Sequence, residues 1–170
     1  MPTFQNAEFA YIALGSNLGD SREIILRAMD RLREFTEQPL LKSSLWQTAP
    51  VDCPPGSPLF VNAVIRLQLR TGQTPDSLLE KLQAVETEFG RRPKKVTNEP
   101  RPLDLDLIAF GQDRRNAPRL TLPHPRAHQR RFVLQPLSEI APDLVLPGQT
   151  KSVMQLLREL PPDETIKKIE

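Results

Sequence analysis

The alternation of apolar and polar residues predicts four main β-strands. We expect them over residues 9–14, 42–48, 59–69 and 103–110. The third is the clearest, because apolar side chains recur at every second position from Leu59 to Leu69 and would line one face of a sheet. The opposite face of this strand carries Asn62 and Arg66 among its residues. A further short strand is expected over residues 119–122.

Two amphipathic helices are predicted between these strands. The first follows Asp20, a capping residue with Glu23 three positions later. The second begins after Thr74, has Pro75 at its first position and ends at Gly90. Each helix has one apolar stripe, formed by Ile24, Ile25, Ala28, Leu32 and Phe35 in the first and by Leu78, Leu82, Val85 and Phe89 in the second.

The order strand, helix, strand, strand, helix, strand predicts an α+β fold of the ferredoxin-like (split βαβ) type. Two further helices, over residues 129–140 and 152–160, would form a C-terminal extension. We expect a sandwich in which helices cover one face of an antiparallel sheet. The other face, or its loops, would then carry the chemistry or the extension. A length of 170 residues indicates a single domain, residues 1–170.

Composition narrows the class of protein. Lys and Arg total 23 and Asp and Glu total 21, so the overall charge indicates no particular partner. Two local basic runs, within residues 91–95 and 126–131, suit a small polyanion better than a long nucleic acid. The single cysteine, Cys53, excludes an internal disulfide and fits a reducing compartment. Without a signal peptide, or the roughly 20 apolar residues that span a membrane, the sequence predicts a cytoplasmic protein without a membrane partner.

The strongest chemical feature is a pair of aspartates in the fourth strand. Leu103, Leu105 and Leu107 share one face of this strand, so Asp104 and Asp106 share the other. Two like charges on one face repel each other, and a divalent cation such as Mg²⁺ would remove that repulsion. The alternative is an ordinary edge strand with its polar face in solvent, which is common in antiparallel sheets.

Familiar nucleotide-binding motifs are absent. The sequence has neither the Gly-x-x-x-x-Gly-Lys-Ser/Thr loop of P-loop enzymes nor the glycine-rich loop and His-Arg-Asp segment of protein kinases. The run from Gly15 to Gly19 is by itself only a strand-to-helix turn. A phosphate-transferring activity would therefore use a different kind of site.

Three segments together resemble the 6-hydroxymethyl-7,8-dihydropterin pyrophosphokinase family. They are residues 11–20 (YIALGSNLGD), 60–63 (FVNA) and 100–107 (PRPLDLDL), the last followed by residues 122–125 (LPHP) and 130–137 (RRFVLQPL). The resemblance covers about residues 8–147 with order and spacing kept. It implies a ferredoxin-like fold and transfer of the terminal diphosphate of ATP to the hydroxymethyl group of a reduced pterin, releasing AMP, in folate biosynthesis.

The resemblance also implies roles for individual residues. Two Mg²⁺ ions would be held by Asp104 and Asp106. Phosphates would be met by the catalytic residues Arg91, Arg101, His124 and Arg130. The pterin would contact Thr48, Val51, Phe60, Asn62 and Phe132. ATP would be surrounded by Gln83, Glu86 and the backbone around Leu107, Leu120 and Thr121, together with His124 and Arg130.

The chemistry of these side chains agrees with the implied roles. A flat heterocycle needs an aromatic face and a satisfied polar edge, which Phe132 and Asn62 can supply. Guanidinium groups suit phosphate oxygens. Each residue also has an ordinary alternative: Asn62 could bond to a loop, Phe132 could belong to the core, and Arg91 and Arg101 could be solvated loop charges.

The sequence departs from the family in the basic loop. Asn98 stands where the family usually has a tryptophan that closes over the pterin, and Pro93 stands where a second basic residue is expected. We therefore predict weaker sealing of the pterin or slower turnover. A catalytically weakened family member with a binding or scaffold role is the alternative function.

The expected partners are small molecules, namely ATP and the reduced pterin, and the protein is expected to be a monomer. Ferredoxin-like sheets often bind RNA on stacked aromatic residues. This chain has only seven Phe and one Trp, with no aromatic pair on a sheet face beside basic residues. We therefore expect no nucleic-acid partner.

Overall fold

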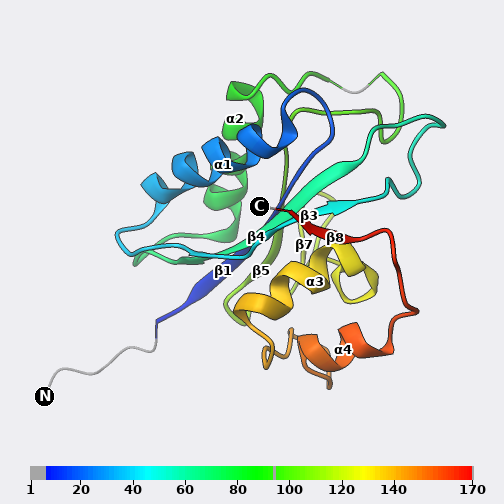
Figure 1. Cartoon of the computed structure of the whole chain (residues 1–170). Helices are drawn as coiled ribbons and strands as arrows, with labels where there is room; N and C mark the ends of the chain where they lie inside the picture. Colours follow the sequence, from blue (N-terminus) through cyan, green and yellow to red (C-terminus); the bar gives the residue numbers. More distant parts are fainter. Residues whose placement is uncertain (1–6, 94, 170) are drawn as a thin grey trace, which may run out of the picture.

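A six-stranded antiparallel sheet forms the centre of the computed structural model, which describes residues 7–93 and 95–169 (Figure 1). The strand order is β5-β1-β4-β3-β8, and β2 also pairs with β4. The strands are β1 (Phe9–Ser16), β2 (Leu41–Lys42), β3 (Leu45–Thr48), β4 (Phe60–Gln68), β5 (Asp104–Phe110) and β8 (Lys167–Ile169). A separate two-stranded sheet joins β6 (Arg115–Asn116) to β7 (Thr121–Leu122).

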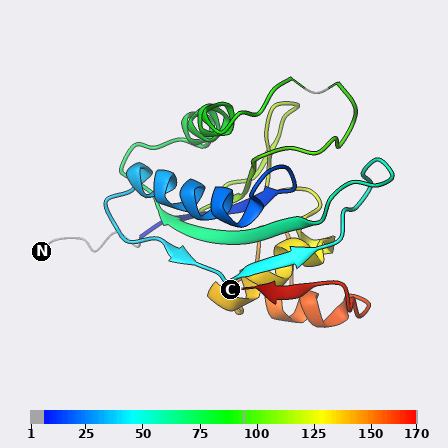
Figure 2. The same ribbon diagram turned by 45° about the horizontal axis from the view of Figure 1, so that its top comes forward.

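Helices cover both faces of the central sheet (Figure 2). One face is covered by α1 (Ser21–Leu32) and α2 (Pro75–Glu88), and the other by α3 (Arg131–Ile140) and α4 (Val153–Glu159). Short 3₁₀ turns, η1 (Arg33–Phe35) and η2 (Ala127–Gln129), follow α1 and precede α3. None of the helices among the described residues is long and apolar enough to cross a membrane.

Strand alternation divides the apolar side chains into two cores. On β1, Ile12 packs with the core beneath α1 and α2, whereas Tyr11 packs with the core beneath α3 and α4. On β4, Ile65 and Val64 divide in the same way. This follows from the two-residue period of a strand, which turns successive side chains to opposite faces.

The α+β, ferredoxin-like prediction is confirmed, because the two predicted helices cross between strands in split βαβ fashion and cover one face of the sheet. Both predicted helix starts are also confirmed. The Asp20 side chain accepts a hydrogen bond from the backbone N–H of Glu23, and Thr74 and Ser77 form a reciprocal capping box.

Outside the central sheet, β6 was not predicted, and β7 is shorter than the strand expected over 119–122. Three further differences concern the central sheet. The strand expected over 42–48 is divided at Ser43, whose hydroxyl accepts from the backbone N–H of Val64 and interrupts the ladder. The strand expected to begin at Leu59 begins one residue later, and Leu59 is half exposed. The third difference is β8, which was not predicted and lengthens the sheet beyond β3.

Candidate active site

A cavity of about 790 Å³ opens beside the end of β5, where β1, β4, α2 and the segment before α3 meet. Most of the residues singled out in the sequence line it together. They are Thr48, Val51, Phe60, Asn62, Gln83, Glu86, Arg91, Arg101, Asp104, Asp106, His124, Arg130 and Phe132. These residues are spread over a stretch of more than 80 positions, from Thr48 to Phe132, so the fold brings together residues that are far apart in the chain.

The two aspartates lie on an edge strand of the sheet. This position was also expected by the alternative interpretation, an edge strand with its polar face in solvent. In the ladder between β5 and β1, Asp104 is opposite Gly15 and Asp106 is opposite Ala13. Leu103, on the other face, is fully buried. The edge strand does not face open solvent at this end, because both carboxylates line the cavity and are only partly exposed.

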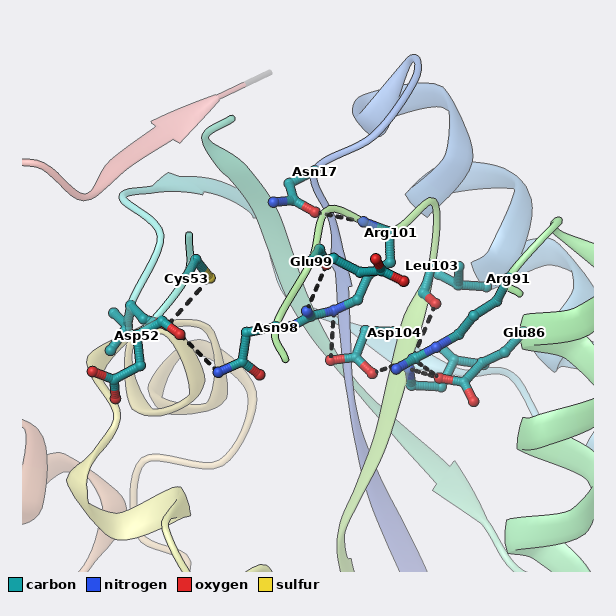
Figure 3. Close-up of polar contacts among 12 residues, drawn as sticks. Asn17, Asp52, Cys53, Glu86, Arg91, Asn98, Glu99, Arg101, Leu103 and Asp104 are labelled. Atoms are coloured by element: carbon teal, nitrogen blue, oxygen red, sulfur yellow. Dashed lines mark hydrogen bonds and ion pairs between the residues drawn. The ribbon is translucent and has the colours of Figure 1, made fainter. Parts of the chain in front are cut away.

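Two arginines meet Asp104 from opposite sides (Figure 3). Arg91 Nη1 donates to Asp104 Oδ1 at 2.6 Å and to Glu86 Oε2 at 2.6 Å. Arg101 Nε is 3.6 Å from Asp104 Oδ2. Glu86 is held in place by the backbone N–H of Leu105, 2.9 Å from Oε2. Helix α2 and strand β5 are thus joined through one shared guanidinium.

Burial changes the protonation of the acidic groups in this cavity. Burial raises the pKa of Asp106 to about 7, and repulsion by Asp104 and Glu86 adds to the effect. Burial also raises the pKa of Glu86, although the hydrogen bond from Leu105 and the charge of Arg91 oppose the rise. Asp106 and Glu86 therefore keep their protons to higher pH than ordinary carboxyl groups do.

His124 enters the cavity as a neutral imidazole at pH 7. Burial lowers its pKa to about 4, and the nearby charge of Arg130 contributes. Its Nδ1 accepts a hydrogen bond from the backbone N–H of Arg126 at 3.2 Å, which assigns the remaining proton to Nε2. His124 can thus donate one hydrogen bond without carrying a charge.

The cavity lining also includes an amide and two aromatic rings. Asn62 Nδ2 donates to Thr48 Oγ1 at 2.5 Å, so its amide is held by the neighbouring strand. The guanidinium of Arg101 lies over the Phe60 ring at 5.2 Å, and that of Arg130 over the Phe132 ring at 5.3 Å. Phe132 is partly buried rather than enclosed in the core.

Gly15 is a site residue that the sequence pattern did not identify. It is opposite Asn62 in the ladder between β1 and β4. A Cβ atom at this position would lie 3.0 Å from Asn62 Oδ1 and 3.6 Å from the Phe60 ring. A glycine inside a strand often marks such a close approach, and this was the available signal.

The β3–β4 loop and the α2–β5 loop meet at the mouth of the cavity (Figure 3). Asn98 Nδ2 donates to the backbone carbonyl of Asp52 at 2.7 Å. Both residues have positive φ, 55° and 53°, a conformation that Asn and Asp adopt more readily than most residues. Asn98, at the position where a tryptophan was expected, thus forms a hydrogen bond between the two loops. No local sequence pattern indicated this bond.

The α2–β5 loop is also tied to the turn after β1. Asn17 Oδ1 accepts from the backbone N–H of Arg101 at 2.9 Å, and Asn17 N–H donates to the Arg101 carbonyl at 3.1 Å. Arg101 Nε is buried and has no hydrogen-bond partner among the described residues. The backbone of Arg101 is therefore fixed while one of its donors remains available.

Three of the residues expected around ATP are not in the cavity lining. Leu107 and Leu120 are buried in the core beneath α1 and α2, and Thr121 is partly buried in β7. The expectation concerned their backbone groups, so it stays a prediction. Val51 lines the cavity but is 57% exposed, so it belongs to the rim.

The carboxylate pair fits a divalent cation only if a ligand supplies further oxygen atoms. Within the described part of the chain, no group of three or more His, Cys, Asp and Glu side chains is arranged to hold a metal ion. Mg²⁺ usually takes one or two carboxylates together with phosphate oxygens and water. Asp104 and Asp106 match that donor set.

Curated relatives define the class of enzyme as pyrophosphokinases. The 2-amino-4-hydroxy-6-hydroxymethyldihydropteridine pyrophosphokinase of Pseudomonas aeruginosa is 44% identical over 138 residues, covering 81% of this chain and 83% of that protein. The enzyme of the same name from Haemophilus influenzae is 38% identical over 159 residues, covering 93% and 96%. Residues 11–142 match the 7,8-dihydro-6-hydroxymethylpterin-pyrophosphokinase family (HPPK), and the chain belongs to this family.

Longer proteins contain the same unit. The folic acid synthesis protein fol1 of Pneumocystis carinii is 37% identical over 153 residues, which are 90% of this chain and 20% of that protein. The crystal structure of wild-type Plasmodium falciparum HPPK-DHPS with pteroate superposes with a TM-score of 0.70 at 13% identity, covering 94% of this chain and 43% of that one. At that identity the superposition confirms the fold alone.

Proposed function

We propose that this protein transfers the terminal diphosphate of ATP to the hydroxymethyl group of 6-hydroxymethyl-7,8-dihydropterin, with release of AMP, in folate biosynthesis. The observation that carries the proposal is a single cavity that combines two kinds of chemistry. Two carboxylates and several arginines line it together with an amide and two aromatic rings. Membership of the pyrophosphokinase family agrees with this combination.

The pterin would lie between Phe60 and Phe132, with its polar edge against Asn62 and Thr48. A heterocycle of this kind loses about 1–3 kcal/mol for each polar group left unpaired, so the fixed amide of Asn62 would discriminate for it. Val51 would cover the outer edge from the β3–β4 loop.

The phosphates of ATP would lie among Arg91, Arg101, His124 and Arg130. Arg101 Nε supports this placement, because it is buried without a hydrogen-bond partner among the described residues, and such a donor is unfavourable until a ligand accepts its hydrogen bond. The neutral His124 would donate from Nε2 without adding charge. Gln83, Glu86 and the backbone near Leu107, Leu120 and Thr121 would surround the adenosine.

Asp104 and Asp106 would hold two Mg²⁺ ions against the phosphates. The ions would neutralise charge on the diphosphate and lower the pKa of the attacking hydroxyl. In the reaction, the hydroxymethyl oxygen bonds to the β-phosphorus, the bond from that phosphorus to the oxygen retained by AMP breaks, and the hydroxyl proton is released. The protein's contribution is to orient the hydroxyl and the diphosphate and to exclude water, as is general for phosphoryl transfer.

The decisive experiment measures AMP and the pterin diphosphate together. The protein is incubated with ATP, Mg²⁺ and the reduced pterin, and both products are separated by chromatography and identified by mass. Equal amounts of the two products are expected, with none after Mg²⁺ is chelated. No AMP above the background of a D104N/D106N double variant would refute the enzymatic proposal and favour the scaffold alternative that Asn98 and Pro93 suggested.

We also propose that the protein acts as a monomeric, single-domain enzyme of the cytoplasm, with small-molecule substrates and no nucleic-acid or membrane partner. Sedimentation at micromolar concentration would test the monomer. Binding of RNA oligomers that weakens with salt would contradict the absence of a nucleic-acid partner.

A further inference from the structure

In this structure, Arg91 contacts the Asp104 carboxylate, which would be a metal ligand in the proposed function. Its Nη1 is 2.6 Å from Asp104 Oδ1 and 2.6 Å from Glu86 Oε2, and it also lies 3.4 Å from the Leu103 carbonyl (Figure 3). One positively charged group thus bridges the first of the two carboxylates on β5 and an acidic side chain on α2. Bridging of two carboxylates is what a metal ion does in many sites.

A second guanidinium lies near the other oxygen of Asp104. Arg101 Nε is 3.6 Å from Oδ2, which is an ion-pair distance but too long for a hydrogen bond, so a guanidinium faces each oxygen of this carboxylate. A divalent ion bound to Asp104 would lie close to both arginines, and like charges at that distance repel strongly in a partly buried site. The charges of both arginines therefore oppose binding of a divalent ion at Asp104, and movement of one arginine away from the carboxylate would relieve this opposition.

The contacts indicate that Arg91 is the one that leaves. The backbone of Arg101 is fixed by two hydrogen bonds to Asn17, and its Nη1 donates to the Glu99 carbonyl at 3.0 Å. The side-chain hydrogen bonds of Arg91 within the described residues all come from Nη1, and the bonds to Glu86 and Asp104 are the short ones. A rotation about its side-chain bonds would release it without moving the strand or the helix.

We propose that Arg91 is a placeholder for the divalent cation: it neutralises Asp104 in the ligand-free protein, and its departure opens the metal position and frees its guanidinium for the phosphates. This inference rests on the proposed function, in which Asp104 is a metal ligand. Glu86, held by the Leu105 N–H, marks the position to which Arg91 returns after the products leave. Metal binding and the Arg91–Asp104 ion pair are then mutually exclusive, and each weakens the other by the same factor.

The test measures metal affinity without nucleotide, and so without turnover. Mn²⁺ is titrated into the nucleotide-free wild type and into R91M, R91K and R92M, and free Mn²⁺ is followed by electron paramagnetic resonance. Removing the competing charge should tighten Mn²⁺ binding by R91M by about tenfold, within the range usual for coupled sites. R91K keeps the charge and should stay near the wild type. R92M removes an exposed charge from the same loop and should change affinity by less than about twofold, as expected for a screened surface charge.

Equal Mn²⁺ affinities for wild type and R91M, including no binding by either, would overturn the placeholder. Equal gains in R91M and R92M would also overturn it, because the effect would then be one of net charge alone. Circular dichroism of each variant verifies folding, and R91K provides a charge-retaining comparison if R91M is unstable. Failure of the proposed function would appear separately, as absence of AMP formation by the wild type.

The same variant should lose activity while it gains metal affinity. If Arg91 also meets the phosphates after its release, kcat of R91M falls although Mn²⁺ binds more tightly. A purely structural role of the ion pair would lower both together.

Discussion

The raised pKa of Asp106 predicts how the free energy of unfolding of this protein depends on pH. Its ordinary pKa of 3.8 rises to about 7 in the folded protein, mainly because the carboxyl is buried and secondly because Asp104 and Glu86 repel its charge. The unfolded chain releases this proton near pH 4, whereas the folded chain keeps it until about pH 7. The folded state therefore binds more protons between these values, and its stability decreases as the pH rises through that window.

The size of the effect follows from the shift. About three pKa units at about 1.4 kcal/mol each give an upper limit of about 4 kcal/mol at pH 8. The side chain keeps some contact with solvent in the cavity, so we expect about 2–4 kcal/mol. D106N removes this titration. The free energy of unfolding of D106N should therefore exceed that of the wild type only slightly at pH 4, and by nearly the full amount above pH 7. The same variant should lose diphosphate transfer.

The assay is urea unfolding of wild type, D106N and D104N in the presence of a chelator at pH 4 and pH 8. D104N is the matched control, because it makes the same chemical change two residues away but breaks the ion pair with Arg91. D106N should be stabilised at pH 8, and D104N should be destabilised or unchanged. If the free energy of unfolding of D106N differed from that of the wild type equally at both pH values, the assigned burial of Asp106 would be wrong.

Three further predictions concern the rest of the cavity. G15A places a Cβ atom 3.0 Å from Asn62 Oδ1 and should raise KM for the pterin by roughly 5- to 150-fold, corresponding to about 1–3 kcal/mol for a disturbed buried amide, with KM for ATP unchanged. N98A removes the hydrogen bond to Asp52, and isothermal titration should show roughly 2- to 12-fold weaker pterin binding; an unchanged affinity would mean that the loop contact does not seal the site. The pKa of His124 near 4 predicts a neutral ring at pH 6, so its nuclear magnetic resonance titration in the ligand-free protein should have no midpoint near 6.5. The unfolded chain protonates His124 at about pH 6.5, whereas the folded chain does so only near pH 4. The contribution of His124 to stability is therefore fully present above pH 6.5 and is lost as the pH falls towards 4.

Much of the framework was determined by the sequence. The alternation in residues 59–69 and the stripes of α1 and α2 are local patterns, because a strand or helix exposes and buries residues within a few positions of one another. The same local rule places Asp104 and Asp106 on one face of β5, opposite three leucines. The helix starts at Asp20 and Thr74 also depend only on neighbouring residues.

Other features were decided by tertiary structure, because they depend on contacts between distant segments. The division of β2 from β3 depends on the Ser43 hydroxyl meeting β4, and β8 depends on an edge left open by β3. Short polar segments carry little local signal, so neither feature is visible in the residue pattern.

The same limit applies to the electrostatics of the site. The sequence indicated Asp104 through the strand spacing and Arg91 through the family resemblance, but it did not show that the two form an ion pair across 13 positions, shared with Glu86. Nor did it show that Asn98 bonds to Asp52, 46 positions away. Residue types determine which groups can bind phosphate and metal. Burial and the contacts between loops determine which of these groups are paired with an opposite charge, and which have a raised pKa, before a ligand binds.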